Sequence, residues 1–249
     1  MVLPIEERAK FFVFVIESPS AADLYNRRSE GELIRRAVEL NRIPCQVRTA
    51  ISLQILEACL VVGLSEAMRA FPGYIPLLHI SAHGDEDGIQ LSDGHIINWN
   101  ALQSLLRPIN QALNGTLIVC MSSCSGYMGV RMAMCELEGP LPYYALIGCG
   151  GAPTWSDTAV AFATLYHQLH IGEHIDTAVQ AMRVASGNSQ FWIQHAETSR
   201  RGYIEHLTRN TEVETVQTNL EKLEEVALNA DQEEVKIVKT TNAVKAFVS

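Results

Sequence analysis

Two reactive side chains each stand at the end of a short apolar run. One run begins at Tyr74 and ends in His83, the other begins at Thr116 and ends in Cys124, and a glycine lies within two residues of each reactive side chain. Neither run has a helical period, and each has the length of a strand buried on both faces. A thiol needs a neighbouring base to become a nucleophile, and an imidazole can take its proton and later return it to a leaving group. We therefore predict a cysteine–histidine dyad, with Cys124 as nucleophile and His83 as general base.

Apolar runs and helical patterns alternate along the rest of the chain. Alternation of this kind requires right-handed crossovers and gives a mostly parallel sheet with helices on both faces. We expect an α/β fold with a central sheet of about six strands, in which the carboxyl ends of parallel strands share one edge, so that His83 and Cys124 meet there. The expected strands cover residues 11–16, 45–51, 75–82, the run that leads into Cys124, 143–148 and 191–195.

The segments between these strands predict the helices. We expect helices at 31–40, 53–71, 98–113, 126–137, 158–170 and 175–186, a polar loop at 18–31, and a small hairpin within 85–97. His79 and Cys120 lie in the same two apolar runs as the reactive pair. Because both precede the strand ends, we expect them to be core residues.

The chain divides by composition near residue 202. We predict one domain over residues 1–202 and an acidic, largely helical extension over residues 203–249, which contains no glycine or proline. Apolar residues from Val213 to Ala227 follow a helical spacing for barely two heptads, too few for a coiled coil. The extension is interpreted either as a solvated helix that folds back on the domain or as a surface for a regulatory protein partner.

Composition limits the partners and the compartment. The net charge of −9 is offset only by short arginine pairs, which argues against nucleic acid and anionic membranes as partners. No apolar run is long enough to span a membrane. The six cysteines form no Cys-x-x-Cys pair and no glycine-rich loop follows the first strand, so we expect no metal and no nucleotide cofactor. Reduced, mostly buried cysteines are typical of a cytoplasmic protein.

The two motifs together resemble the caspase-like cysteine peptidases, and most closely their bacterial CHAT branch. The resemblance lies in His83-Gly84 at the end of one strand and in Ser122-Ser123-Cys124-Ser125-Gly126 at the end of the next. The stretch from residue 148 to 185 is also similar, with a tryptophan near an aspartate, two helices and an alanine-rich close. The resemblance covers roughly residues 11–196.

This resemblance implies a three-layer caspase-like fold and a cysteine endopeptidase that cleaves a protein or peptide substrate through a thioester intermediate. An acyl transfer of this kind needs two preorganised donors for the oxyanion, and the resemblance implies the backbone N–H groups of Gly84 and Cys124. Only a short segment separates the cysteine motif from the following strand, so regulation by a partner or ligand is expected rather than cleavage between two subunits. The alternative is a catalytically inactive interaction module in a signalling or defence complex.

The preferred substrate side chain stays open between two opposite interpretations. Arg27 or Arg28, in the loop after the first strand, would favour an acidic residue before the cleaved bond. Asp157 with Trp155 would close a pocket that favours arginine or lysine, although Asp157 could equally be a helix cap. The acidic loop from Asp85 to Asp87 could line a pocket for a basic residue or could simply be solvated.

Overall fold

The computed structural model describes residues 10–210. The chain forms two compact units, residues 1–201 and residues 202–249. In the second unit only residues 202–210 are described, and they are helical. The apolar pattern from Val213 to Ala227 lies outside the described residues, as does most of the acidic extension.

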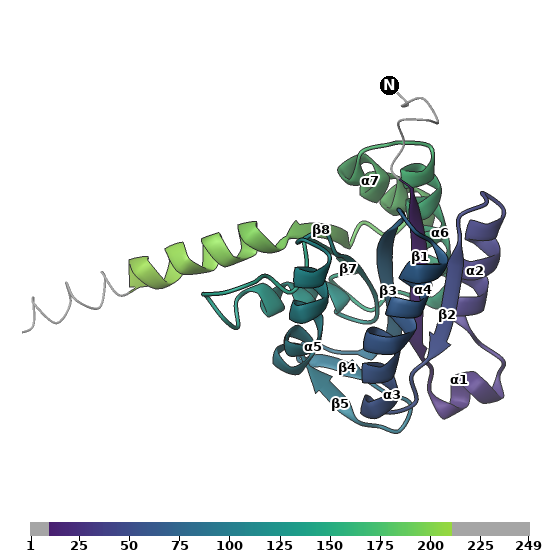
Figure 1. The fold of residues 1–249 in the computed structure, drawn as a ribbon, viewed down its shortest axis with the longest axis horizontal. Coiled ribbons are helices and arrows are strands. Elements are labelled where there is room, and N and C mark those ends of the chain that lie inside the picture. Colours follow the sequence, from purple (N-terminus) through teal and green to yellow (C-terminus); the bar gives the residue numbers. More distant parts are fainter. Residues whose placement is uncertain (1–9, 211–249) are drawn as a thin grey trace, which may run out of the picture. The chain divides into compact units, whose positions relative to one another are not determined.

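A mixed, mostly parallel sheet forms the centre of the first unit (Figure 1). Its main path runs β2-β1-β3-β6-β7-β8, in which the first five strands are parallel and β8 is antiparallel to β7. A hairpin of β4 and β5 extends from the end of β3. The bounds are β1 Phe11–Ser18, β2 Cys45–Thr49, β3 Ile75–Gly84, β4 Gly88–Gln90, β5 Ile96–Asn98, β6 Ile118–Ser122, β7 Ala145–Cys149 and β8 Phe191–His195.

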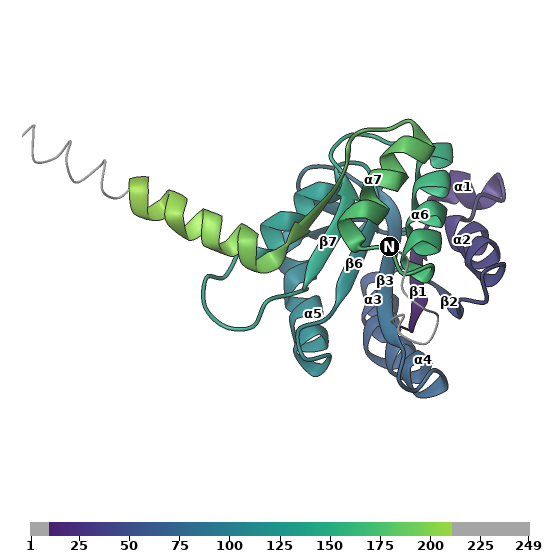
Figure 2. The same ribbon diagram turned by 90° about the horizontal axis from the view of Figure 1, so that it is seen from above.

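Helices cover both faces of this sheet, as Figure 2 shows. One layer contains α3 (Leu53–Ala58), the π-helical η2 (Cys59–Gly63), α4 (Leu64–Ala70), α5 (Trp99–Ala112) and the 3₁₀-helical η3 (Gly126–Ala133). The other contains α2 (Glu30–Glu39), α6 (Trp155–His170) and α7 (Ile175–Ser186). The short helix α1 (Ala21–Tyr25) follows β1.

The alternation of side chains along β1 explains the two hydrophobic cores. Phe12, Phe14 and Ile16 pack under the α3–α5 layer, whereas Val13 and Val15 pack under α2, α6 and α7. A strand buried on both faces is apolar along most of its length, and residues 11–16 of β1, the run that predicted it, are all apolar. The expected α/β fold with three layers is confirmed, and it is consistent with a caspase-like arrangement.

Four local expectations were wrong in detail. The segment 126–137 was expected to be a regular helix, but it is the 3₁₀ helix η3, which lies directly on the next strand. A Cβ atom on Gly148 of β7 would lie 2.7 Å from the carbonyl carbon of Gly126, so the two backbones touch. The helix expected at 53–71 is interrupted by the π-helical turn η2.

The other two corrections concern helix starts. The polar loop expected at 18–31 contains α1 and the start of α2, and α1 begins with a capping box between Ser20 and Asp23. Helix α6 begins at Trp155 rather than near Thr158, because Thr154 is the cap and Asp157 completes its capping box.

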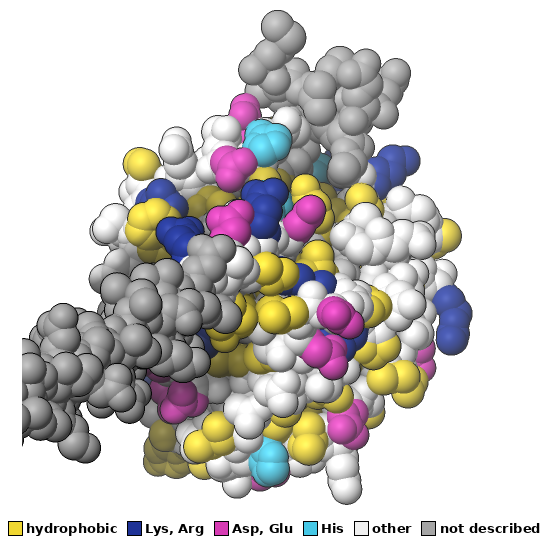
Figure 3. Space-filling model, turned by 90° about the vertical axis from the view of Figure 1, so that its left-hand side faces the viewer, with side chains coloured by type: hydrophobic (Ala, Val, Ile, Leu, Met, Phe, Trp, Pro, Cys, Tyr) yellow, Lys and Arg dark blue, Asp and Glu magenta, His cyan; other side chains and the backbone are white. Residues whose placement is uncertain are grey.

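Charged side chains of both signs are mixed with apolar ones on the face drawn in Figure 3. Across residues 10–210, no helix combines the length and the apolar content needed to cross a membrane. All six cysteines are free thiols.

Candidate active site

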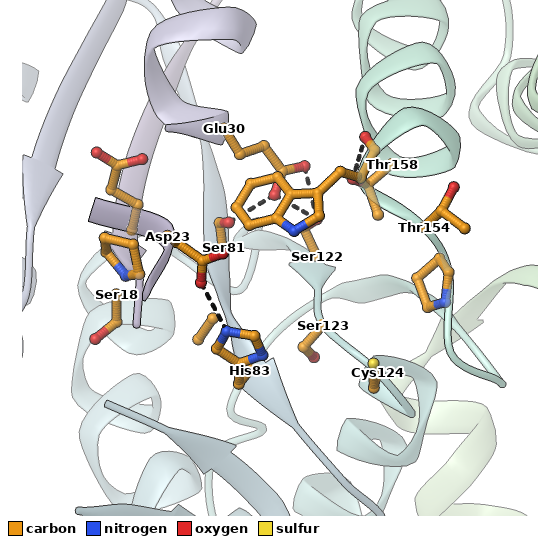
Figure 4. A pocket seen from close by; sticks show the side chains of 15 residues that line it. Ser18, Asp23, Glu30, Ser81, His83, Ser122, Ser123, Cys124, Thr154 and Thr158 are labelled. Carbon is orange, nitrogen blue, oxygen red and sulfur yellow. Dashed lines mark hydrogen bonds and ion pairs between the residues drawn. The ribbon is translucent and has the colours of Figure 1, made fainter. Parts of the chain in front are cut away.

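The register between β3 and β6 brings the two motifs together. Ser81 and Ser122 are the last paired residues of these neighbouring parallel strands. His83 lies two residues further along β3, and Cys124 lies two residues further in the turn that follows β6. Both residues line one pocket at this edge of the sheet (Figure 4).

Gly84 marks the point of closest approach between the motifs. A Cβ atom at this position would lie 2.9 Å from the carbonyl oxygen of Cys124 and 3.1 Å from the Cβ of Ser123. No side chain fits between two backbones at such distances, which explains the glycine after the histidine. Gly84 also pairs with Ile89 of β4, so β3 continues two residues beyond its expected end at Ala82.

A tight turn holds Cys124 between β6 and η3. Ser125 has a left-handed backbone with φ of 52°, and its N–H donates to the carbonyl oxygen of Gly151 at 2.8 Å. The N–H of Gly126 donates to the carbonyl oxygen of Ser123 at 3.2 Å. Strained backbone of this kind is concentrated at functional sites. Cys124 itself is half-buried, so its sulfur can meet a ligand.

Asp23 holds the imidazole of His83. The Nε2 atom of His83 lies 2.9 Å from the Oδ2 atom of Asp23, and the His83 side chain is half-exposed whereas Asp23 is buried. The same carboxylate accepts hydrogen bonds from the backbone N–H of Ser20 at 3.1 Å and from its hydroxyl at 2.5 Å. The capping box of α1 therefore fixes the carboxylate that orients the histidine.

The charge of Asp23 determines the tautomer of His83. Burial acts to raise the pKa of Asp23, but hydrogen bonds from Ser20 and His83 outweigh burial and hold the pKa below its ordinary value. An ionised carboxylate can only accept, so Nε2 carries the proton and Nδ1 is left with its lone pair. In Figure 4 the ring of His83 lies between Asp23 and Cys124. The arrangement can therefore accept a proton from a thiol on one side of the ring and stabilise the resulting imidazolium on the other.

A second buried carboxylate, Glu30, closes the inner end of the pocket. It is the first residue of α2 and is 4% exposed, and it accepts hydrogen bonds from the Ser81 hydroxyl at 2.6 Å and from the Ser122 hydroxyl at 2.7 Å. Burial raises the pKa of the Glu30 carboxyl, although hydrogen bonds from Ser81, Ser122 and Thr158 oppose the shift.

Sequence reasoning missed both Asp23 and Glu30. The spacing of Ser20 and Asp23 is a capping-box signal that the sequence does contain, but it reveals only the helix start. Their partners on β3 and at the end of β6 lie 51 to 92 residues away along the chain. Only the assembled sheet brings them into the pocket.

His79 and Cys120 are core residues, as expected. Both are fully buried, and Nδ1 of His79 lies 2.8 Å from the hydroxyl of Tyr166. Burial lowers the pKa of His79 to about 3 and raises that of Cys120 to about 12, so both are neutral near pH 7. His79 lies 3.7 Å from Glu30, beyond hydrogen-bond distance, and the two form no ion pair while the imidazole is neutral.

The four expected substrate-binding residues lie in different places. Trp155 lines the pocket together with Cys124. Arg27 and Arg28 line a neighbouring depression, and Arg28 lies 3.9 Å from Asp23 with its side chain 57% exposed. Asp157 lines neither of these two hollows: it accepts from the backbone N–H of Thr154 at 3.1 Å and from the side-chain amide of Asn188 at 3.3 Å.

The acidic loop from Asp85 to Asp87 is arranged around its own backbone. The carboxylate of Asp85 accepts hydrogen bonds from the N–H groups of Asp87 and Gly88. Asp85 lines a small depression on the hairpin side of His83, away from the inner end of the main pocket. Within residues 10–210, no group of three or more histidine, cysteine, aspartate or glutamate side chains is arranged to hold a metal ion.

Comparison with known proteins adds no family assignment. No protein-family model matches the chain, and no curated protein matches it in sequence.

Proposed function

We propose that this protein is a cysteine endopeptidase that hydrolyses peptide bonds of a protein substrate. The main support for the proposal is that Cys124 and His83 line the same pocket and that Asp23 is hydrogen-bonded to Nε2 of His83. A nucleophile, a base and a group that orients the base are the parts that covalent acyl transfer requires.

The reaction follows from the proton positions. Nδ1 of His83 takes the thiol proton of Cys124, and the thiolate attacks the carbonyl carbon of the bond to be cleaved. The imidazolium, stabilised by Asp23, then gives this proton to the departing amine, and a thioester of Cys124 with the acyl group remains. Water, deprotonated by His83, attacks the thioester, releases the carboxylic acid and restores the thiol.

The negative oxygen of each tetrahedral intermediate needs donors that are already in place. We assign this role to the backbone N–H groups of Gly84 and Cys124. The contact between these two backbones, with no side chain at Gly84, supports this assignment. Loss of one such donor typically costs a factor of about 100 to 1,000 in rate.

Regulation and compartment complete the proposal. The stretch between η3 and β7 is short, so activation by a protein partner or a ligand, with the acidic extension as the candidate contact, is favoured over cleavage into subunits. Six free thiols fit a reducing compartment such as the cytoplasm.

The test compares two cysteines of the same strand region. Wild type, Cys124→Ala and Cys120→Ala are incubated with a randomised peptide library, and the products are identified by mass spectrometry. We expect cleavage by wild type and by Cys120→Ala, whose core substitution costs stability rather than activity, and none by Cys124→Ala. Cleavage that survives Cys124→Ala would overturn the proposal. Failure of a peptidyl electrophile to label Cys124 even with protein partners present would favour the interaction-module alternative.

A further inference from the structure

The pocket beside Cys124 is acidic. Glu17, Asp23 and Glu30 line it, and no lysine or arginine among residues 10–210 does so. Its cavity volume is about 100 Å³, so it takes one side chain rather than a larger ligand. Because Cys124 and His83 lie in the same lining, a side chain that enters here belongs to the residue whose carbonyl is attacked.

The three carboxylates differ in what already neutralises them. Asp23 has His83 and, 3.9 Å away, the exposed Arg28. Glu17 accepts from the hydroxyl of Ser29 and the N–H of Gly31, and Glu30 accepts from serine hydroxyls. In the part of the chain that the structure describes, neither glutamate forms an ion pair with lysine or arginine. Burying a carboxylate without a cation is unfavourable because the charge loses its hydration. A cation that enters the pocket offsets part of this free energy.

Ser123 gives a second, independent sign of a missing ligand. The residue is 5% exposed, it lines the pocket, and its hydroxyl oxygen has no hydrogen-bond partner within residues 10–210. A buried polar atom left without a partner is destabilising. A ligand that brings hydrogen-bond donors into the pocket would satisfy this atom.

The polar side chains of the pocket form a series that begins beside Cys124 and ends at Glu30. Figure 4 shows Ser123 beside Cys124, Ser122 and Ser81 further in, and Glu30 at the opposite end from Cys124. When the carbonyl carbon of a substrate residue lies at Cys124, the side chain of that residue would extend past these acceptors toward Glu30. An elongated side chain with donors at its tip fits this order.

We infer, on the basis of the proposed peptidase function, that this pocket takes the arginine side chain of the residue before the cleaved bond, with Glu30 as the residue that determines specificity. A guanidinium presents several N–H donors in a planar fork, which suits the two oxygens of the Glu30 carboxylate. The hydroxyl of Ser123, which lies beside Cys124, would accept from an N–H nearer the backbone of the bound residue. Lysine, a point charge, is accepted less well. An acidic residue is rejected because it would face two buried glutamates.

Two further findings bear on this choice. Arg27 and Arg28, which would favour an acidic substrate residue, line the neighbouring depression and not the pocket, although Glu30 and Trp155 line both. Burial already raises the pKa of Glu30, and a paired guanidinium would favour its ionised form. Binding of the basic side chain is therefore expected to weaken as Glu30 becomes protonated at acidic pH.

The first experiment measures cleavage with the residue before the bond varied. Glu30→Gln keeps the shape of the side chain and removes its charge, and Glu32→Gln is the matched control because Glu32 lies on the same helix, exposed and paired with Arg35 and Arg36. We expect kcat/KM for arginine peptides to fall at least 100-fold in Glu30→Gln and to stay within threefold in Glu32→Gln. Ser123→Ala, which removes no hydrogen bond among residues 10–210, should lower it several-fold with the fold intact by thermal unfolding.

A second measurement needs no cleavage. Agmatine, which carries the guanidinium of arginine, should slow the alkylation of Cys124 by iodoacetamide in wild type and Glu32→Gln but not in Glu30→Gln, whereas γ-aminobutyrate should protect none of them. Cleavage that depends on Cys124 but prefers acidic or apolar residues, or an arginine preference unchanged in Glu30→Gln, would overturn the inference and leave the proposed function standing. A complete absence of cleavage that depends on Cys124 would overturn the proposed function, and agmatine protection would still report on the pocket.

Discussion

Two neighbouring strands lead to the same pair of residue types twice. His79 of β3 pairs with Cys120 of β6 in the middle of the sheet. His83, near the end of β3, and Cys124, in the turn after β6, each lie four residues further along the chain, at the edge. The inner pair therefore serves as an internal control for how the surroundings change the charge state and reactivity of a histidine and a cysteine.

The two histidine–cysteine pairs differ in their exposure to solvent. Phe162 and Tyr166 of α6 enclose His79, with its ring 4.7 Å from that of Phe162, and no solvent reaches it. At the edge, the first turn of α6 lines the open pocket through Trp155 and Thr158, and the capping box of α1 supplies Asp23 to His83. The inner pair is kept neutral by burial, whereas the outer pair combines access to solvent with a charge that orients the imidazole.

The largest expected effect separates the two histidines by activity. His83→Ala should lower kcat/KM for peptide cleavage by about 1,000-fold or more, because it removes the group that takes the thiol proton. The measurement is steady-state cleavage of the best library peptide, with circular dichroism to show that the fold persists. A loss smaller than tenfold would mean that the outer pair does not act as a dyad.

Reactivity should separate the two cysteines by a similar margin. We expect iodoacetamide to modify Cys124 at least about 1,000 times faster than Cys120 at pH 7.5, because Cys120 is fully buried and burial raises its pKa to about 12. Peptide mapping after timed quenching gives both rates in one sample. Unfolding in urea is the control, since both thiols should then react alike. Equal rates in the folded protein would contradict the comparison.

The role of Asp23 can be tested by comparison with Asp157, which occupies the same capping-box position in another helix. Asp23 and Asp157 both complete capping boxes, of α1 and α6, but only Asp23 contacts His83. Asp23→Asn should lower kcat about 100-fold, because an amide that donates to Nε2 favours the tautomer whose Nδ1 already carries a proton. Asp157→Asn should change the rate less than threefold. Similar losses in both variants would show that only the helix caps matter.

The outer pair was predictable because strand ends carry local signals. Uninterrupted apolar runs predicted strands buried on both faces, and each run ended on a reactive side chain with a glycine within two residues. Asp23 and Glu30 were not predictable, since they come from a polar segment whose local pattern only reveals helix starts. Their roles depend on contacts with β3 and β6 that no spacing within that segment encodes.

The inner pair carries the smallest predicted effect, a dependence of stability on pH. Burial lowers the pKa of His79 from an unfolded value of 6.5 to about 3, so the unfolded chain binds a proton that the folded chain excludes. Stability contributed by neutral His79 is therefore complete above pH 6.5 and is lost as the pH falls toward 3. Between pH 7.5 and 5 the loss should be about 2 kcal/mol.

Urea unfolding at pH 7.5, 6 and 5 measures this loss. Glu30 acts in the opposite direction, because its raised pKa favours proton uptake by the folded state, so wild type alone reports a sum. The double variant His79→Phe/Tyr166→Phe replaces both members of the buried hydrogen bond and keeps Glu30, and its stability should fall about 2 kcal/mol less than that of wild type over this range. An equal fall in the two proteins would show that the buried histidine is not what separates the inner pair from the outer one.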